Sequence, residues 1–228
     1  YDKDKIITNS GFGSKVSKKA TIISRLASSQ SSITINDFST TRLEKNNLIN
    51  KAFGMYAGEM PIEVLTSARQ KPNEASPVVV GLKGVRAVFS QEPEQGKPMN
   101  ASVLKQYSGG DEITGRMLYG NPVTFIPQWK LFTCCNELPI LPGDDGGVWR
   151  RVRVVHFGSK FVDNPDGSEH QYKKDESLKD KFDMYAEPFM WIIVQYYKDY
   201  KKVGLVEPEE VKEVTKEYKN EMDRFSDF

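Results

Sequence analysis

The segment from residue 83 to residue 157 constrains the fold most, because strand-like apolar runs alternate there with a helical pattern and glycine-rich turns. Residues 85–90 and 130–135 are mostly apolar, and we expect both to be buried strands. Between them, Asn100 can cap a helix over residues 100–107, and the turn at Gly120 predicts a hairpin. Strands that alternate with helices predict an α/β fold with a central sheet.

Helical patterns flank this segment. On the N-terminal side, apolar stripes predict helices over residues 20–27 and 42–53. On the C-terminal side, we expect a strand over residues 148–157 and helices over residues 178–200 and 208–222. The predicted organisation is an N-terminal helical or partly irregular segment (1–50), a core domain (51–160) and a C-terminal helical extension (161–228).

Composition limits the classes of function. The 228 residues include 28% charged side chains and carry a formal net charge of +1, which argues against a nucleic-acid binder that acts through net charge alone. No apolar run reaches the ~20 residues of a membrane span, and the chain opens without the apolar core of a signal peptide. Cys134 and Cys135 are adjacent, which excludes ordinary disulfide geometry between them. We expect a soluble intracellular protein with two buried, inert thiols.

An acidic residue follows the first buried strand. Glu92 comes two residues after Ser90, and a carboxylate at such a strand end can hold magnesium and polarise an attacking water. A solvated strand end is the ordinary explanation of a single Glu at this position. The functional interpretation therefore depends on the polar residues that follow.

Cations and glycines come next along the chain. Lys105 lies on the predicted helix, Gly109 and Gly110 form a turn, and Arg116 lies in the strand after it. Two cations and exposed backbone amides are suited to gripping a phosphodiester backbone without reading its bases. An ordinary basic surface is the alternative for each cation taken alone.

An amide and paired guanidiniums complete the pattern. Asn136 ends the strand over residues 130–135, where its side chain can donate to a γ-phosphate or to an attacking water. An Asn there can also simply begin a turn. Arg150 and Arg151 follow Trp149, and paired guanidiniums on an aromatic anchor can stabilise charge on a neighbouring subunit's nucleotide.

Six motifs share their order and spacing with one known family. They are residues 83–86, 91–94, 105–111, 114–119, 130–139 and 149–151. Together they resemble the superfamily 3 helicase domain of poxvirus-type primase-helicases, a group that includes proteins of large eukaryotic DNA viruses and of related phages and plasmids. The resemblance covers roughly residues 50–160, and residues 206–228 resemble the family's C-terminal extension.

This resemblance implies an AAA+-type P-loop NTPase core that assembles as a homo-hexameric ring. Such a ring hydrolyses ATP with Mg²⁺, translocates on single-stranded DNA and unwinds the duplex at a viral replication fork. It also implies a primase domain or polymerase as partner, no membrane association, and a location in the host cytoplasm or at a viral replication site.

The resemblance also assigns residue roles by position. Glu92 resembles the Walker B acid on the magnesium side, and Asn136 resembles the sensor of the γ-phosphate. Arg150, with Arg151 second, resembles the arginine finger. Lys105 resembles the cation of the family's B-prime motif, and the turn from Gly109 and Gly110 to Arg116 resembles the DNA-gripping hairpin.

One element of the family is missing from this sequence. The phosphate loop Gly-x-x-x-x-Gly-Lys-Ser/Thr should precede the helix that ends at Phe53, but residues 36–43 contain no glycine and have Arg42 in place of Lys. Without glycines the backbone amides cannot wrap a β-phosphate. Either a segment between about Asn46 and Leu48 is missing from the sequence, or the nucleotide site has decayed. The second explanation leads to an alternative function, a non-hydrolysing DNA-binding or scaffold ring.

Overall fold

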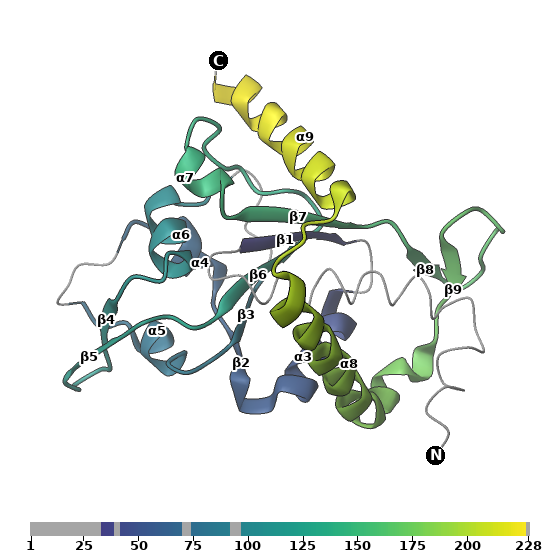
Figure 1. The fold of residues 1–228 in the computed structure, drawn as a ribbon, viewed down its shortest axis with the longest axis horizontal. Coiled ribbons are helices and arrows are strands. Elements are labelled where there is room, and N and C mark those ends of the chain that lie inside the picture. Colours follow the sequence, from purple (N-terminus) through teal and green to yellow (C-terminus); the bar gives the residue numbers. More distant parts are fainter. Residues whose placement is uncertain (1–32, 39–41, 70–73, 92–96, 227–228) are drawn as a thin grey trace.

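Five parallel strands form the central sheet in the computed structural model of the chain, which describes residues 33–38, 42–69, 74–91 and 97–226 (Figure 1). The strand order is β2-β3-β6-β1-β7. These strands are β1 (Ile33–Phe38), β2 (Ala57–Glu59), β3 (Ala87–Ser90), β6 (Lys130–Cys135) and β7 (Val152–Phe157).

The strands β3 and β6 run side by side with a register that pairs Ser90 with Thr133. On its other side β6 pairs with β1, and β1 pairs with β7. Because every pair in this sheet is parallel, the carboxyl ends of these strands lie at one edge. Both faces of β3 and most of β6 are buried, as expected for a sheet covered on two sides.

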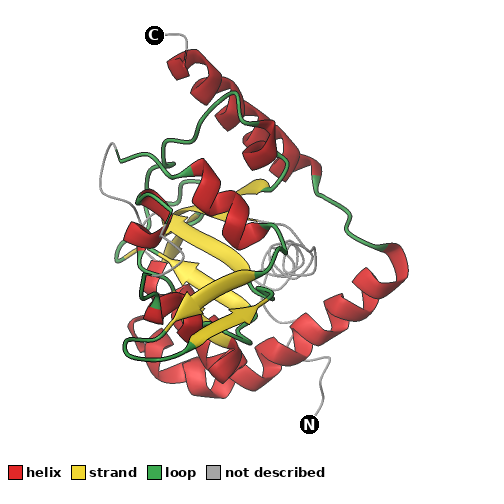
Figure 2. Cartoon of the chain, turned by 90° about the vertical axis from the view of Figure 1, so that its left-hand side faces the viewer, coloured by secondary structure: helices red, strands yellow, loops and turns green. Residues whose placement is uncertain are grey.

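One face of the sheet is covered by α3 (Arg42–Phe53). The side chains of Ile49 and Phe53 pack against a cluster formed by Ala87, Phe89 and Phe132. The long helix α8 (Phe182–Val203) packs against α3, and Lys51 of α3 pairs with Asp183 of α8. Figure 2 shows helices around both faces of the sheet.

The other face carries the largest part of the core. It is built with α4 (Ile62–Thr66), α6 (Ala101–Ser108) and α7 (Gly146–Trp149). From these helices Leu65, Leu104 and Val148 enter one buried cluster with Val88 and Leu131 of the sheet. The sheet is therefore the middle layer of a three-layer α/β arrangement.

A hairpin projects from the sheet between α6 and β6 in chain order. Its strands are β4 (Ile113–Arg116) and β5 (Pro122–Phe125), which pair antiparallel, and α5 (Pro77–Gly81) packs against β4. The Ser76 amide donates to the Arg116 carbonyl at 2.8 Å. A Cβ on Gly115 would lie 2.7 Å from the Ser76 hydroxyl oxygen, so this close approach requires glycine. The end of β4 nearest the hairpin turn is therefore held against the start of α5.

The C-terminal part adds two helices and a small sheet. The short strands β8 (Lys160–Val162) and β9 (Gln171–Lys173) form a separate parallel pair. Much earlier in the chain, the 3₁₀ turn η1 (Gly54–Tyr56) follows α3. After β9 come the 3₁₀ turn η2 (Glu176–Lys181), α8 and α9 (Glu209–Ser226). The last helix lies along β7 (Figure 1), where the Val154 amide donates to the Thr215 hydroxyl at 3.0 Å. None of the described helices combines the length and apolar character needed to cross a membrane.

Several sequence-based predictions are confirmed. The helix over residues 42–53, the strand over residues 130–135, the hairpin that turns at Gly120 and the helix that begins just after Pro208 all form as expected. Asn100 caps α6 by accepting from the amides of Ser102 and Val103. The α/β fold class is confirmed as well.

Other predictions are wrong in their bounds. The strand predicted over residues 148–157 begins only at Val152, because the Asp145 carboxylate accepts from the Val148 amide and starts α7 instead. The helix predicted from residue 178 begins at Phe182, after the 3₁₀ turn η2 that Asp175 caps. The region after residue 158, interpreted as a flexible loop, contains β8 and β9.

The N-terminal region contributes to the sheet more than the sequence indicated. Residues 33–38 form the strand between β6 and β7, although they lie ahead of the predicted core that begins at residue 51. The helix α3 crosses the predicted boundary between residues 50 and 51. The helix predicted over residues 20–27 lies outside the described residues.

Candidate functional site

Two buried hydroxyl groups lie at the carboxyl edge of the sheet. Ser90 ends β3, Thr133 lies opposite it on β6, and both side chains are 0% exposed. Neither hydroxyl oxygen has a hydrogen-bond partner among the described residues. A buried hydroxyl without a partner is uncommon because its desolvation is uncompensated. This edge therefore carries two polar atoms that could serve a ligand.

The predicted acid and amide follow these same two strands. Asn136 comes directly after β6 and is exposed, and Gln91, also exposed, comes directly after β3. Glu92 is the next residue and lies outside the described residues. Because β3 and β6 are adjacent and parallel, their carboxyl ends lie side by side. The sequence prediction required this adjacency, since strands that ended at opposite edges would have separated the acid from the amide.

The connection from β1 to α3 is short. β1 ends at Phe38 and α3 begins at Arg42, so only Ser39, Thr40 and Thr41 join them. A phosphate-binding loop at such a strand-to-helix junction has eight residues and two glycines. The point at which the sequence suggests a missing segment, between Asn46 and Leu48, lies within α3, and the missing segment stays a prediction.

The residues at this edge fit a magnesium–nucleotide group only in part. The hydroxyls of Ser90 and Thr133 and the amide of Asn136 supply oxygen and nitrogen atoms of the kind that a hydrated cation and a γ-phosphate contact. The three-residue connection supplies no glycine amides for a β-phosphate. Among the described residues, no group of three or more His, Cys, Asp or Glu side chains is placed to hold a metal ion.

Lys105 is held by an ion pair at the junction of α6 and α7. Its ammonium group donates to the Asp145 carboxylate at 2.7 Å. Arg151 lies at the same junction, where its guanidinium donates to the Gly147 carbonyl. The structure thus brings the side chains of Lys105 and Arg151, two of the predicted site cations, close to Gly147 of α7. Their contacts with Asp145 and Gly147 also give both residues a structural role.

The ion pair at this junction predicts a pH-dependent contribution to stability. The hydrogen bond from Lys105 lowers the pKa of the Asp145 carboxyl. The stabilisation is therefore complete above the ordinary pKa of about 4, and it is lost as the pH falls through the lowered pKa. We expect Asp145→Ala to lower the free energy of unfolding by about 0.5–2 kcal/mol at pH 7, the usual range for a lost helix cap.

Denaturant unfolding at pH 7 and at pH 2 measures this effect, and the difference from the parent chain should shrink at the lower pH. Asp144→Ala is the matched control, since Asp144 is exposed and directly precedes the cap. An equal loss for Asp145→Ala at both pH values would contradict the assignment.

Arg150 lies apart from the carboxyl edge. It is exposed, follows α7 directly, and lines a cleft between β7 and α9. Asn136 does not line this cleft. Within the chain the predicted finger therefore does not join the predicted sensor, and its role across a subunit interface stays a prediction.

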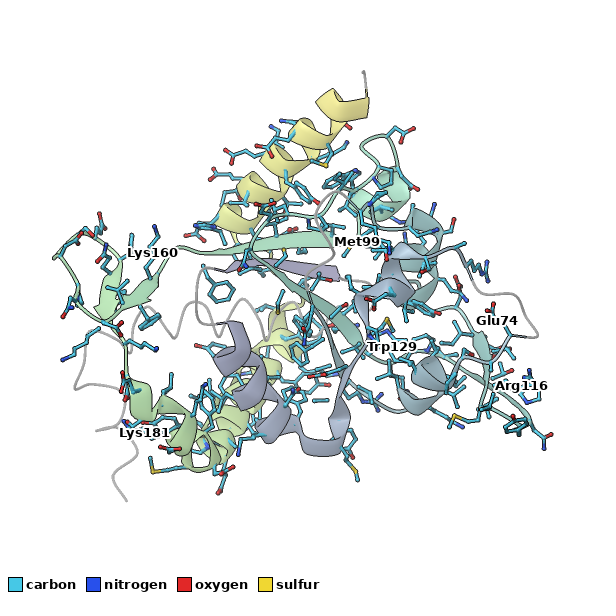
Figure 3. The ribbon with its side chains drawn as sticks, turned by 180° about the vertical axis from the view of Figure 1, so that it is seen from behind. Glu74, Met99, Arg116, Trp129, Lys160 and Lys181 are labelled. Carbon is cyan, nitrogen blue, oxygen red and sulfur yellow. The ribbon has the colours of Figure 1, made fainter. Side chains whose placement is uncertain are left out.

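The hairpin differs from its sequence-based description. Gly109 and Gly110 belong to the link between α6 and β4, and Arg116 ends β4 opposite Pro122. Figure 3 shows Arg116 on the same side of the molecule as Glu74, with Lys160 and Lys181 at the opposite end. The hairpin itself spans residues 113–125, so its tip comes after the turn that the sequence singled out.

The most exposed hairpin residues were missed in the sequence. Met117, Leu118 and Tyr119 form the tip, and Tyr119 is 95% exposed with a φ of 60°. Apolar side chains presented this openly at a hairpin tip suggest contact with another molecule. The signal was the Gly120-Asn121-Pro122 turn, which places the three preceding residues at the end of the hairpin.

Comparisons with known proteins find relatives of this chain in several viruses. No protein-family model matches it. It is 36% identical over 190 residues to "Putative helicase L207/L206" of Acanthamoeba polyphaga mimivirus, covering 79% of this chain and 20% of that protein. It is 32% identical over 191 residues to "Putative helicase 022R" of Frog virus 3, again covering 79% and 20%. It is 26% identical over 151 residues to "Putative primase C962R" of African swine fever virus, covering 64% of this chain and 16% of that protein.

Solved structures show a related fold. The apo C-terminal region of NrS-1 matches with a TM-score of 0.54 and 14% sequence identity, covering 77% of this chain and 40% of that one. A second structure of the same region gives a TM-score of 0.56 and covers 89% and 47%. At this identity the likeness concerns the fold alone. The chain spans about a fifth of the length of the mimivirus and Frog virus 3 relatives.

Proposed function

Because the chain is homologous to viral proteins named as helicases and primases, we propose that it is the motor region of an ATP-dependent DNA helicase with an AAA+-type P-loop NTPase core. The observation that carries this proposal is the strand order. The strand that leads to Glu92 lies directly beside the strand that leads to Asn136, and β1 follows on the far side of β6. Ligands of open α/β sheets bind at the carboxyl ends of such strands.

In this proposal the residues at the carboxyl edge of the sheet bind ATP and activate the water that attacks it. Bound ATP with Mg²⁺ supplies the phosphoryl group that is hydrolysed. Glu92 would hold the magnesium ion and accept a proton from the attacking water, and Asn136 would donate to the γ-phosphate oxygens. Ser90 and Thr133 supply the nearby hydroxyls whose hydrogen bonds are unmade. Arg150, with Arg151 second, stabilises charge on the nucleotide of the next protomer in a homo-hexameric ring.

The hairpin is the proposed contact with single-stranded DNA. Exposed aromatic side chains offer a face on which bases stack without sequence preference, and Tyr119 is such a side chain. Arg116 lies at the turn end of β4, close to this tip, and Gly109 and Gly110 lie in the link that leads from α6 into the hairpin. Lys105 would have to leave Asp145 to grip a phosphate, so we assign it a smaller share of DNA binding.

Partners and location follow from the relatives. A primase domain or a polymerase is the proposed partner at a viral replication fork, since one relative carries a primase name. The proposed location is the host cytoplasm or a viral replication site. No membrane partner is proposed.

The hairpin assignment predicts a loss of DNA affinity in Tyr119→Ala. A lost base-stacking contact costs about 1–3 kcal/mol, which corresponds to a dissociation constant roughly 5- to 150-fold larger. Fluorescence anisotropy with a labelled oligothymidine measures it. Tyr119→Phe, which keeps the ring, should bind as the parent does, and Met55→Ala controls for an exposed apolar residue elsewhere. Unchanged affinity in Tyr119→Ala would rule out stacking at the tip.

The helicase function itself is tested by ATP hydrolysis and strand separation in the complete viral protein. We expect single-stranded DNA to stimulate hydrolysis and ATP to drive unwinding. Glu92→Gln, which removes the acid and keeps its size, should abolish both while DNA binding remains. Unwinding that continues in Glu92→Gln would remove Glu92 from the mechanism.

A second function is favoured by one observation. The connection of three residues between β1 and α3 lacks glycine, which suits a ring that binds DNA through the hairpin without turning over nucleotide. In such a non-hydrolysing DNA-binding or scaffold ring, Tyr119→Ala would still weaken DNA binding, but the protein would neither hydrolyse ATP nor unwind DNA when ATP is added.

A further inference from the structure

A cleft of about 290 Å³ opens between the end of α7, β7 and α9. Its lining is strongly basic, with five cationic side chains against one carboxylate. The charged lining residues are Arg150, Arg153, Lys212, Lys216, Lys219 and Glu207. None of the sequence motifs assigned a role to the three lysines.

The two walls of the cleft are fixed relative to each other. The Thr215 hydroxyl accepts from the Val154 amide at 3.0 Å, and the Tyr218 ring meets the Trp149 ring edge-on at 5.2 Å. The Tyr218 hydroxyl donates to the Pro139 carbonyl. Because α9 is anchored in this way, the lysines on it stand in a defined position opposite the arginines of the α7–β7 wall.

Only part of the positive charge in the cleft is compensated. Arg153 pairs with Glu207 at 2.6 Å, and Lys212 pairs with Glu209 at 2.8 Å. Within the described parts of the chain, no carboxylate lies within ion-pair distance of Arg150, Lys216 or Lys219. Three cations thus face one small volume, and their mutual repulsion favours an anion between them.

Between its first and last turns, which carry Glu209 and Asp223 on the lysine flank, the charges of α9 are sorted by helix face. Lys212, Lys216 and Lys219 recur at helical spacing beside the buried stripe that contains Val211 and Tyr218. Four exposed glutamates occupy the opposite flank, namely Glu210, Glu213, Glu217 and Glu221. An evenly solvated surface helix would mix the two signs along each flank, so the basic flank forms a continuous strip.

The lining indicates which anion fits. Trp149 is 7% exposed and its indole donates to the Pro142 carbonyl at 2.9 Å, so no aromatic face is open for a base or a peptide side chain. At 1.5 Å per residue, Lys212 and Lys219 are about 10 Å apart along the helix axis. That length holds two neighbouring phosphates of an extended single strand, whose spacing is wider than the roughly 3.4 Å rise per strand along a duplex axis. A strip of cations without apolar anchors suits phosphates in a row.

We propose that Lys216 and Lys219 of this cleft bind the phosphodiester backbone of single-stranded nucleic acid, as a second contact besides the hairpin, while Arg150 keeps its proposed role at the neighbouring nucleotide. The identity of the ligand rests on the proposed helicase function, because the relatives are named for enzymes that act on nucleic acid. The same phosphate chemistry is also presented by a nucleotide polyphosphate. An acidic surface of another protein molecule is a different partner and would be revealed by a change of assembly state.

The test uses Lys216→Gln/Lys219→Gln in the 228-residue chain and leaves Arg150 unchanged. Lys198→Gln/Lys201→Gln is the matched control, with the same charge change and spacing on exposed positions of α8. Oligothymidine binding is measured by anisotropy between 50 and 200 mM salt. For a single strand, each lost phosphate contact makes the negative slope of log K against log salt shallower by about 0.7. We therefore expect a slope that is shallower by about 1.4 for the cleft variant and unchanged for the control.

Further measurements distinguish single-stranded nucleic acid from the other anions that fit the cleft. Weakened binding of ATP or tripolyphosphate, with oligothymidine binding unchanged, would overturn the proposal in favour of a nucleotide ligand. A changed sedimentation coefficient of the cleft variant without DNA would overturn it in favour of a protein interface. Normal oligothymidine binding by the cleft variant, beside weak binding by Tyr119→Ala, would refute the cleft and leave the hairpin function intact. If the parent chain itself bound no oligothymidine, the proposed function would fail first.

Discussion

If the proposed ring forms, Arg150→Ala is expected to lower its DNA-stimulated ATP hydrolysis by about 10³-fold or more, the usual effect of removing an arginine finger. Arg150 is exposed at the end of α7, directly after the buried Trp149. A guanidinium mounted on such an anchor can reach a neighbouring protomer with little loss of side-chain freedom. Steady-state phosphate release measures the rate.

A mixing experiment separates action across the interface from a local defect. Arg150→Ala and Glu92→Gln protomers are each expected to be inactive alone. In a mixed ring, an Arg150→Ala protomer keeps its own acid and receives the guanidinium of a Glu92→Gln neighbour, so part of the activity should return. Arg151→Ala is the control for the adjacent guanidinium, which is held by the Gly147 carbonyl and should matter less. Full activity of Arg150→Ala would refute the finger.

Tyr218→Ala is expected to lower the free energy of unfolding by about 3–5 kcal/mol, as for other large aromatic deletions in cores. Tyr218 is 2% exposed, packs edge-on against Trp149 and donates to the Pro139 carbonyl. Its removal leaves a cavity beneath α9 and an unpaired carbonyl. Urea unfolding followed by circular dichroism measures the change.

Two variants calibrate this result. Tyr218→Phe keeps the ring and removes only the hydroxyl, so about 1–3 kcal/mol of the loss should remain. Tyr119→Ala makes the same substitution at an exposed residue and should change stability by less than about 0.5 kcal/mol. If Tyr218→Ala were as mild as Tyr119→Ala, α9 would not be docked against the sheet, and the cleft between them would lose its second wall.

The elements that the sequence predicted correctly are those whose signals are local. The helix over residues 42–53, the strand over residues 130–135 and the cap at Asn100 each depend on neighbours within a few residues. The α7 helix was mistaken for strand because Val148 and Trp149 favour strands. The Asp145 carboxylate, which starts that helix, decided the outcome.

The strand β1 was missed for a tertiary reason. Its sequence, Ile-Thr-Ile-Asn-Asp-Phe, is half polar and gives no strong strand signal. It is held by hydrogen-bonded neighbours on both sides, β6 and β7, which lie more than ninety residues further along the chain. Local pattern cannot reveal a strand whose stability comes from such distant pairing.

The sequence analysis named candidate site residues in their order along the chain, but it did not predict which side chains contact one another. The sequence gave no sign that Lys105 pairs with Asp145, or that the lysines of α9 meet Arg150 and Arg153. These partners are about forty and sixty residues apart, and only the packing of α9 on β7 brings the second group together. The exposed tip at Tyr119 was inferable from its turn residues, since a hairpin tip is set by local geometry.

Titration of ATP into the protein, with its encoded sequence confirmed across residues 30–55, tests the proposed nucleotide-driven motor most directly. Calorimetry with and without Mg²⁺ should show saturable, magnesium-dependent binding that Glu92→Gln alters. If that protein releases no heat with ATP at any magnesium concentration, the carboxyl edge of the sheet is not a nucleotide site and the chain belongs to a non-hydrolysing ring.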